Sequence, residues 1–600
     1  MFLFRDNECI DIYLKNTNQY VRYAVEDLIK DFNRVSENSL KPRYITEENE
    51  WCLVIEENSN DCDCPIFDES YSIKRDGNII RIIAKTYLGT MWGIYTFCEQ
   101  ILGVDPCFLF NDCEIEKKRT LEIGEINIDD KPKNYGFRGL FINDEDLLTG
   151  WKESLGVRKV DYMYYHTTVA PNAMDEVVET ALRLKFNLII PASLLDIGNP
   201  SEKALVDCVA KRGIFVSQHH IEPLGVSHFT LENYYNRYDN FSYAKNPDLF
   251  KEIWQCYATK WAEYDNVIWQ IGLRGKGDKA IWDGKPTDEE LEIYAQIISE
   301  SMSEQIKIVE NTTKKKKNYF TTTLWSEGSI LFEKNLLEVS DNTVIIFSDT
   351  GPNQMFGEDY YVVPRRKDYN YGIYYHLQYF ADGPHLAPQT GIDKLYYNLK
   401  KADENGDTSY SIINVSNIRE FVFEMNACGK ILWDINKFEK EEYLDKCFNK
   451  YGKYANEMKR IINSYFLELP ELDISCLEKH YRQFFNYDFA DAPKEIKNFV
   501  LKDGAIVEYG ATVISNFRKK YSGDLCEDFY YEIKKVIPKY EKMLIALNNI
   551  VGLMPENLRK HTEAKWTLFI DTLLGIYKWY VNLYEAREFY HKGANYIKIK

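Results

Sequence analysis

The sequence NVIWQIGLRG, residues 266–275, is a short apolar run that ends in an arginine and a glycine. Runs of the same kind recur along the chain as GLFIN (139–143), NLIIPA (187–192), GIFVSQHH (213–220), NYFTTTLW (318–325), TVIIFSD (343–349), YGIYYHLQYF (371–380) and SIINVSN (411–417). Each run is too short for an isolated helix and too apolar for a strand with one face in water. We therefore predict eight strands that are buried on both faces.

Helix-like stretches separate these runs, among them MDEVVETALRLK (174–185), PDLFKEIWQCYATKWAEY (247–264), DEELEIYAQIISESMSEQI (288–306) and DKLYYNLKKA (393–402). Strands that alternate with helices predict a parallel sheet with right-handed crossovers. Eight such units match a (β/α)8 TIM barrel, whose active site lies where the strands end. A doubly wound open sheet is the alternative. It usually carries a glycine-rich phosphate turn before a helix, and GLRGKGD (272–278) has no helical pattern after it.

The segments outside the barrel predict two further domains. Residues 1–132 mix short strands such as NIIRIIAK (78–85) with helices such as QYVRYAVEDLIKDFNRV (19–35), as in an α/β domain. Residues 133–432 would form the barrel. Residues 433–600 carry apolar side chains at helical spacing. The expected fold class is therefore α/β, with a TIM barrel between an N-terminal α/β domain and a C-terminal helical bundle.

The composition limits the partners and the compartment of the protein. The net charge of −19 argues against a nucleic-acid partner, because phosphate binding needs a basic surface. Thirteen cysteines without regular spacing do not describe a disulfide framework. The segment MFLFRDNECIDIYLK (1–15) lacks the features of a signal peptide, and no stretch reaches the ~18 uninterrupted apolar residues that span a bilayer. We therefore predict a cytoplasmic protein without a membrane partner, and a homodimer stays open.

Polar residues follow the predicted strands and would face the active site of a barrel. They are Asn143, Asp144, Glu145, His219, His220, Glu222, Arg274, Lys276, Asp278, Glu327, Asp349, Tyr375, His376, Asn414 and Asn417. In GFRGLFINDEDLLTGW (136–151), Asn143 and Asp144 are candidate substrate ligands, although an Asn-Asp-Glu turn can also be a helix N-cap.

SQHHIEP (217–223) places His219, His220 and Glu222 after the third strand. These residues can hydrogen-bond sugar hydroxyls, and a carboxylate beside an imidazole can tune a proton-transfer pKa. The segment is not H-E-x-x-H and has no third ligand at a helical offset, so neither a metal nor another cofactor is predicted. One of the two histidines could equally be structural.

Three further strand ends supply candidate ligands and a candidate acid. Arg274 can bind a carboxylate through two parallel hydrogen bonds, with an ion pair to a neighbouring acid as the alternative. Glu327 stands near Trp325, and an acid whose pKa is raised by an apolar neighbour suits general-acid catalysis in a glycosidase. A plain N-cap glutamate would have no such role. YYHLQY (374–379) and INVSN (413–417) offer the hydrogen-bonding groups Tyr375, His376 and Asn414, with core packing as the alternative for the tyrosines.

Six segments resemble the glycoside hydrolase family 115 xylan α-glucuronidases. In chain order they are GFRGLFINDE, LRLKFNLIIPAS, GIFVSQHHIEP, NPDLFKEIWQCYATKWAEYDNVIWQIGLRGKGD, GIYYHLQYFADGP and IINVSN. The likeness runs over residues 80–435. The stretch TYLGTMWGIYTFCEQILGVDP (86–106) is also similar to the N-terminal domain of that family.

The resemblance implies an inverting hydrolase that removes α-1,2-linked glucuronic acid or its 4-O-methyl ether from xylan fragments. It implies Glu327 as a catalytic carboxylate and Glu222 as the second. It implies uronate contacts from Asn143, His220, Arg274, Tyr375 and Asn414. The chain has Lys276 where the family usually has an acid, and no segment matches the family's common C-terminal β-sandwich. We therefore expect a divergent member.

The leading hypothesis is an α-glucuronidase whose partner is a uronic-acid-bearing oligosaccharide and which serves xylan degradation. A barrel hexosaminidase is the enzymatic alternative, although that mechanism usually needs two adjacent acids after the fourth strand, where Lys276 intervenes. A catalytically silent sugar-binding protein is the alternative outside the enzymes. Glu327→Gln would separate these cases, because it should abolish turnover but spare simple binding.

Overall fold

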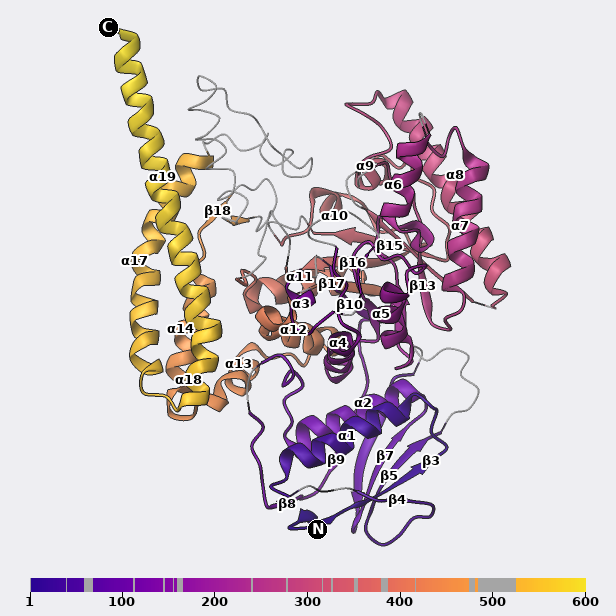
Figure 1. Cartoon of the computed structure of the whole chain (residues 1–600), viewed down its shortest axis with the longest axis vertical. Helices are drawn as coiled ribbons and strands as arrows, with labels where there is room; N and C mark the ends of the chain where they lie inside the picture. The colour runs from indigo at the N-terminus through magenta and orange to yellow at the C-terminus, as the bar shows by residue number, and fades with distance from the viewer. Residues whose placement is uncertain are drawn as a thin grey trace.

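A computed structural model gives the fold of the chain. Its helices and strands form N-terminal sheets, a closed barrel and a group of C-terminal helices (Figure 1). It describes residues 2–38, 40, 42–58, 68–111, 114–143, 146–154, 156–158, 166–238, 241–276, 279–315, 317–324, 327–349, 354–378, 387–415, 417–473, 481–483 and 525–599.

Eight parallel strands close into a barrel in their order along the chain. They are β10 (Phe137–Phe141), β11 (Leu188–Ile190), β12 (Phe215–Ser217), β13 (Val267–Gln270), β14 (Tyr319–Leu324), β15 (Thr343–Ser348), β16 (Asn370–His376) and β17 (Tyr410–Asn414). The ring closes where β17 pairs with β10, with Asn414 opposite Phe141. The predicted TIM barrel is confirmed, and each predicted run overlaps one of its strands.

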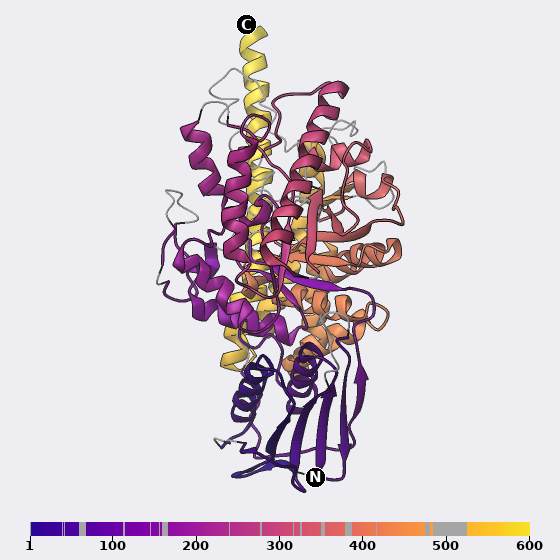
Figure 2. The same ribbon diagram turned by 90° about the vertical axis from the view of Figure 1, so that its right-hand side faces the viewer.

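Helices connect the strands and surround the barrel (Figures 1 and 2). Longer ones are α4 (Pro171–Arg183), α5 (Pro200–Ala210), α7 (Pro247–Trp261), α8 (Asp288–Thr313), α11 (Ile392–Asn405) and α12 (Ile418–Trp433). Proline begins three of them, at a position where the missing N–H is not needed. Shorter ones follow strand ends: α3 (Asp146–Thr149), η2 (Pro223–Gly225), α6 (His228–Arg237), α9 (Glu327–Glu333) and α10 (Glu358–Val362).

Alternate residues of the strands fill the barrel interior. The apolar cluster there consists of Phe137, Phe141, Leu188, Ile190, Phe215, Ile268, Ile346, Tyr374, Tyr410 and Ile412, all buried. Since side chains alternate along a strand, the residues between them point outward and pack against the helices. The apolar cluster therefore closes the middle of the barrel and leaves its polar groups at the carboxyl ends of the strands.

The described part of the N-terminal region combines β-sheet with helices (Figure 2). In the six-stranded sheet the order is β4 (Tyr44–Ile45), β3 (Asp11–Lys15), β5 (Cys52–Glu57), β7 (Ile79–Ala84), β6 (Tyr71–Asp76), β9 (Asn127–Asp130). Helices α1 (Val21–Val35) and α2 (Tyr87–Phe97) pack together, α2 lies on this sheet, and η1 (Cys98–Leu102) continues it. The smaller sheet comprises β2 (Glu8–Cys9), β1 (Phe2–Arg5) and β8 (Thr120–Glu122).

Buried ion pairs join the N-terminal region to the barrel. Arg183 of α4 contacts Asp31 of α1 at 2.7 Å. Arg212 contacts Asp27 of the same helix at 2.5 Å. A third pair joins Arg138 of β10 to Glu69, which precedes β6. These side chains are almost completely shielded from water, so each charge depends on its partner.

The C-terminal region is mainly helical. It contains α13 (Lys440–Phe448), η3 (Asn449–Tyr454), α14 (Ala455–Leu467), α17 (Leu525–Val551), α18 (Glu556–Thr562), η4 (Glu563–Thr567) and α19 (Leu568–Ile599). The long helices α17 and α19 lie side by side (Figure 1). Two short strands, β18 (Glu471–Asp473) and β19 (Tyr481–Gln483), pair in a stretch that the sequence did not predict as sheet.

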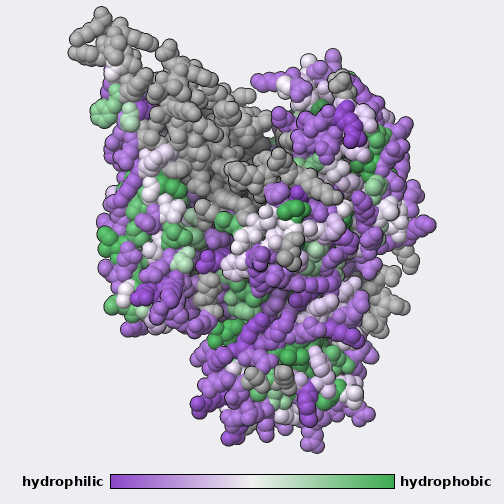
Figure 3. Space-filling view, viewed as in Figure 1, coloured by the Kyte–Doolittle hydropathy of each residue, from purple (hydrophilic) through white to green (hydrophobic). Residues whose placement is uncertain are grey.

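The molecular surface is dominated by hydrophilic residues on the face that Figure 3 shows, with hydrophobic residues in small separate patches. Within the part of the chain that the structure describes, no helix is both long enough and apolar enough to cross a membrane.

Candidate active site

Polar side chains meet at the carboxyl end of the barrel interior. His219 and His220 follow β12, Arg274 follows β13, Asp349 follows β15, and β16 and β17 contribute Tyr374, His376 and Asn414. Most of them are buried, whereas His220 and Arg274 are half-buried. We call this group the polar end of the barrel. It lies where a TIM barrel carries its chemistry.

A chain of rings crosses the polar end from β12 to β16. The ring centroid of His219 lies 4.9 Å from that of Phe141 and 4.5 Å from that of His220. The His220 ring lies 5.5 Å from Tyr374, whose ring lies 4.4 Å from His376. Strands β12 and β16 stand on opposite sides of the eight-stranded ring. The polar side chains of the two sides therefore face each other across the interior.

The two adjacent histidines are held in the neutral form. Burial lowers the pKa of His219 to about 3 and holds the pKa of His220 well below its ordinary value. Nearby cationic groups, Arg274 among them, act in the same direction on both rings. At neutral pH the rings therefore offer uncharged hydrogen-bonding nitrogens, and Arg274 supplies the positive charge beside them.

Two buried polar atoms of the polar end have no partner in the described part of the chain. They are Nδ1 of His219 and Oδ1 of Asn414, and the Asn414 side chain is fully buried. The other amide atom, Nδ2 of Asn414, donates to the hydroxyl of Tyr374 at 2.9 Å. Buried polar atoms are rarely left without a partner, so this arrangement suits a ligand that brings hydroxyl groups.

Asp349 is a member of the polar end to which the sequence assigned no role. Its Oδ2 accepts from the backbone N–H of His376 at 2.9 Å, and its Oδ1 pairs with Nδ1 of the same ring. Both side chains are buried. Asp349 ends the predicted run TVIIFSD, so the rule that polar residues follow barrel strands already pointed to it.

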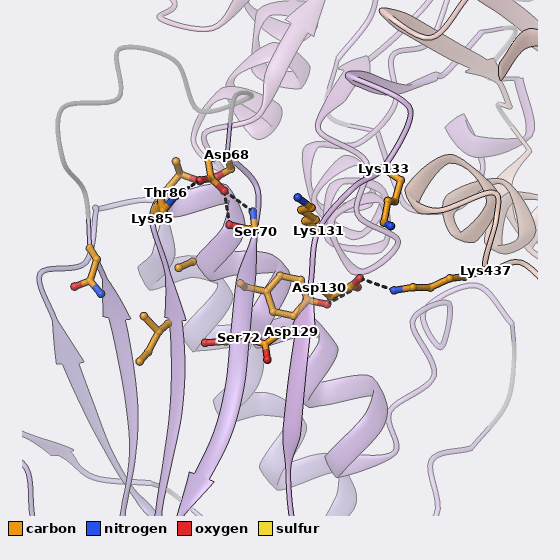
Figure 4. Close-up of a pocket in the computed structure, with 14 residues that line it drawn as sticks. Asp68, Ser70, Ser72, Lys85, Thr86, Asp129, Asp130, Lys131, Lys133 and Lys437 are labelled. Atoms are coloured by element: carbon orange, nitrogen blue, oxygen red, sulfur yellow. Dashed lines mark hydrogen bonds and ion pairs between the residues drawn. The ribbon is translucent and has the colours of Figure 1, made fainter. Parts of the chain in front are cut away.

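A hollow lies against the N-terminal sheet (Figure 4). It has a volume of about 760 Å³, and lysines and aspartates line much of it. Lys85 contacts Asp68 at 2.8 Å, and Lys437 contacts Asp130 at 3.3 Å. Lys133, also in its wall, precedes β10 and thus marks the end of the barrel opposite the polar end. Its paired charges and its location separate this hollow from the candidate active site.

The comparison with known families identifies the chain. The model described as glycosyl hydrolase family 115 matches residues 130–470, which is more than half of the sequence. The chain belongs to this family. The match confirms the resemblance found in the sequence, and as a family 115 member the protein is a glycosidase.

Solved structures share the fold of this family 115 chain. A family GH115 4-O-methyl-α-glucuronidase with specificity for decorated arabinogalactans has 16% identity and a TM-score of 0.74, and the match covers 96% of this chain and 73% of that one. A GH138 enzyme targeting pectin rhamnogalacturonan II has 13% identity and a TM-score of 0.57, with 96% and 86% covered. No curated protein matches the sequence. At these identities the likeness concerns the fold.

Tyr375, which was expected to contact the sugar, faces away from the polar end. Its hydroxyl donates to the backbone carbonyl of Gln354 at 3.0 Å, and its fully buried ring belongs to the core outside the barrel. Tyr374 belongs to the interior cluster instead. Because neighbouring residues of a strand point to opposite faces, a tyrosine at this site must be Tyr374.

Glu222, expected as the second catalytic acid, donates its backbone N–H to the carbonyl of His219 at 2.9 Å, but its carboxyl group bonds elsewhere. Its Oε1 accepts from the backbone N–H of His228 at 2.8 Å, so the carboxyl group closes the loop before α6. Among the charges that act on it are those of Arg158, Glu202 and Asp196. Burial raises the pKa of Glu222 well above its ordinary value. The structure therefore gives it a different environment from that of the polar end.

The remaining predicted residues lie at strand ends of the family 115 barrel. Asn143 follows β10, and its Oδ1 accepts from the hydroxyl of Ser193 at 2.7 Å. Glu327 is the first residue of α9, just beyond β14, and its side chain lies outside the described residues, as does Asp144. Among the residues that the structure does describe, no group of three potential ligands could hold a metal ion.

Proposed function

We propose that this enzyme removes glucuronic acid or its 4-O-methyl ether, α-1,2-linked, from xylo-oligosaccharides or a related glycan that bears uronic acids. One observation carries the proposal. Arg274 is a cation at a polar end whose neighbouring histidines are neutral. A uronic acid combines one carboxylate with several hydroxyls, and this pairing of one guanidinium with uncharged hydrogen-bonding groups is complementary to it.

The hydroxyl groups of the sugar have candidate partners. Oδ1 of Asn414 can accept from one hydroxyl, and Nδ1 of His219 can bond to another. The Tyr374 ring lies between those of His220 and His376, tilted against both, and presents an aromatic body with a polar tip. Together these groups support a polyhydroxylated ligand over an apolar one.

In the proposed reaction Glu327 is a catalytic carboxylate. Its place at the start of α9, after β14, supports this role because barrel catalysts lie at strand ends. An inverting glycosidase needs two carboxyl groups about 6.5–9.5 Å apart with a water between them. We assign Glu327 alone, since the carboxyl group of Glu222 bonds to the loop before α6.

The test is release of uronic acid from aldouronic oligosaccharides, with wild type and Glu327→Gln side by side. We expect release by wild type, and loss of about 10³-fold or more in the variant. Proton NMR of the first-formed sugar would show the β-anomer if the α-linkage is hydrolysed with inversion. Saturable binding without release by wild type would contradict the enzyme and favour a sugar-binding protein. Release of a hexosamine from amino-sugar substrates would favour the hexosaminidase.

The substrate panel should contain two glycan classes. Xylan fragments follow from the resemblance of the sequence, and decorated arabinogalactan fragments follow from the specificity of the structurally similar family 115 enzyme. We place the reaction in the cytoplasm. The eight cysteines whose side chains the structure describes are free thiols, and most of them are buried, which suits a reducing compartment.

A further inference from the structure

The side chain of Asp349 bonds twice to His376 on the neighbouring strand. One carboxylate oxygen accepts from the backbone N–H of His376 and the other pairs with ring atom Nδ1. In addition, the backbone N–H of Asp349 donates to the carbonyl of Tyr374 at 3.0 Å. Asp349 is 1% exposed and His376 is 2% exposed, so water does not compete for these bonds.

This geometry decides which nitrogen of His376 carries the proton. A carboxylate can only accept hydrogen bonds, so Nδ1 must be the donor. In a neutral imidazole the other nitrogen, Nε2, then holds the lone pair. Any hydroxyl that meets Nε2 in this state meets an acceptor.

We propose that Asp349 is a positioning residue, which sets the Nδ1–H tautomer of His376 so that Nε2 accepts a hydroxyl of the bound uronic acid. In the polar end, Arg274 would then bind the carboxylate of the sugar, and His376 would accept a hydrogen bond from a ring hydroxyl. The inference rests on the proposed function for the identity of the ligand. The Nδ1–H donor itself follows from the contact with Asp349, whatever the ligand.

Asp349→Asn is the informative substitution, because asparagine has the same size but only one accepting oxygen. The backbone N–H of His376 cannot change its role and would hold that oxygen. The amide NH2 would then face Nδ1, and the ring proton would move to Nε2. The acceptor presented to the sugar would become a donor, as when an Asp→Asn change reverses the histidine tautomer in a serine-protease triad.

The first experiment is a double-mutant cycle on uronic acid release, with Asp349→Asn, His376→Gln and the double variant. We expect each single change to lower kcat/KM by about 10- to 100-fold. We expect the double variant to be no worse than the poorer single one, because Asp349 acts through His376. Losses that multiply would overturn the proposal, since Asp349 would then act independently.

A matched control separates positioning from general stability. Asp407 is also fully buried and contacts Arg365 at 2.8 Å, but it precedes β17 and lies at the opposite end of the barrel. Asp407→Asn should lower the melting temperature and leave kcat/KM within about twofold. An equal loss of activity in the control would assign the Asp349→Asn effect to folding and overturn the proposal.

The second experiment needs no substrate, so it distinguishes this inference from the proposed function. With ring-¹⁵N histidine, the Nδ1–H proton of His376 should give a far-downfield resonance that shows one-bond coupling to nitrogen. The signal should be present in wild type and absent in His376→Gln and Asp349→Asn. Its absence in wild type would overturn the tautomer assignment. Its presence in a protein that releases no uronic acid would refute the function and leave the tautomer intact.

Discussion

The junction between the N-terminal region and the barrel buries charged groups, and so does the polar end of the barrel, but the two regions pair their polar atoms differently. At the junction, Arg138, Arg183 and Arg212 each contact a buried carboxylate. At the polar end, Nδ1 of His219 and Oδ1 of Asn414 have no partner among the described residues.

The difference separates two uses of burial. A buried ion pair specifies how two surfaces fit together, and the loss of one member leaves a charge without water or partner. A buried polar atom without a partner is unfavourable in the empty protein, yet a ligand can complete it. Substitutions at the junction should therefore change stability, and those at the polar end should change activity.

The largest effect is expected from Glu69→Gln at the junction. This change leaves the guanidinium of Arg138 buried beside a neutral amide, although backbone carbonyls of Tyr135 and Gly136 still accept from it. We expect a loss of about 3–5 kcal/mol in unfolding free energy, measured by chemical denaturation. The half-exposed pair Glu48–Arg81 provides the control, and Glu48→Gln should lose no more than about 1 kcal/mol. Equal losses would contradict the comparison.

At the polar end, Arg274→Met should act on catalysis. Loss of the cation that we propose as the partner of the uronate carboxylate should lower kcat/KM by about 10²–10³-fold, or about 3–4 kcal/mol, with the melting temperature nearly unchanged. Arg274→Lys keeps the charge but loses the two-pronged geometry and should fall in between. Arg366→Met, at an exposed pair with Asp368, is the control. Full activity of Arg274→Met on uronic-acid substrates would mean that another group binds the carboxylate.

The barrel could be predicted from the sequence because a strand buried on both faces is a nearly continuous apolar run. The location of Arg274, His220 and Asn414 at the carboxyl end of the barrel could also be predicted, because it depends only on the position of each residue along its strand. The paired charges of the junction could not be predicted. They join residues far apart in the chain, such as Asp31 and Arg183, and nothing in either local sequence marks the other.

Side-chain direction was the second limit of the sequence. Tyr374 and Tyr375 are both buried aromatics. In a strand that is apolar on both faces, the sequence does not show which of two neighbouring side chains points into the barrel. The position of the Glu222 carboxyl group has another cause. The backbone turns at Leu224, which has a φ of +54°, and Glu222 bonds to the N–H of His228 beyond that turn. The sequence did not indicate this turn, because leucine, which follows SQHHIEP, rarely adopts a positive φ.

The two tyrosines of β16 allow the same comparison, between a change in activity and a change in stability, within one strand. Tyr374→Phe removes the hydroxyl that accepts from Asn414 and should lower kcat/KM by about 10-fold with little change in stability. Tyr375→Phe removes the bond to the Gln354 carbonyl and should cost about 1 kcal/mol of unfolding free energy with activity unchanged. Kinetics and melting curves of both variants are the measurement. The reverse assignment would mean that Tyr375 is the sugar ligand, as the sequence predicted.

The smallest effect concerns Glu222 and depends on pH. Burial raises its pKa, so the folded protein keeps a proton that the unfolded chain releases near pH 4.3. The stabilising contribution of the protonated Glu222 is therefore fully present below that pH and is lost as the pH rises toward the pKa of the folded state. Glutamine has no such proton and can still accept from His228, so Glu222→Gln should melt higher than wild type at pH 8 and about equally at pH 4. The exposed Glu252 of α7 is the control, and Glu252→Gln should change little at either pH. If Glu222→Gln instead lowers kcat/KM by about 10³-fold without raising the melting temperature, Glu222 is the second catalytic acid. Its carboxyl group would then act in catalysis and not only hold the loop before α6 through His228.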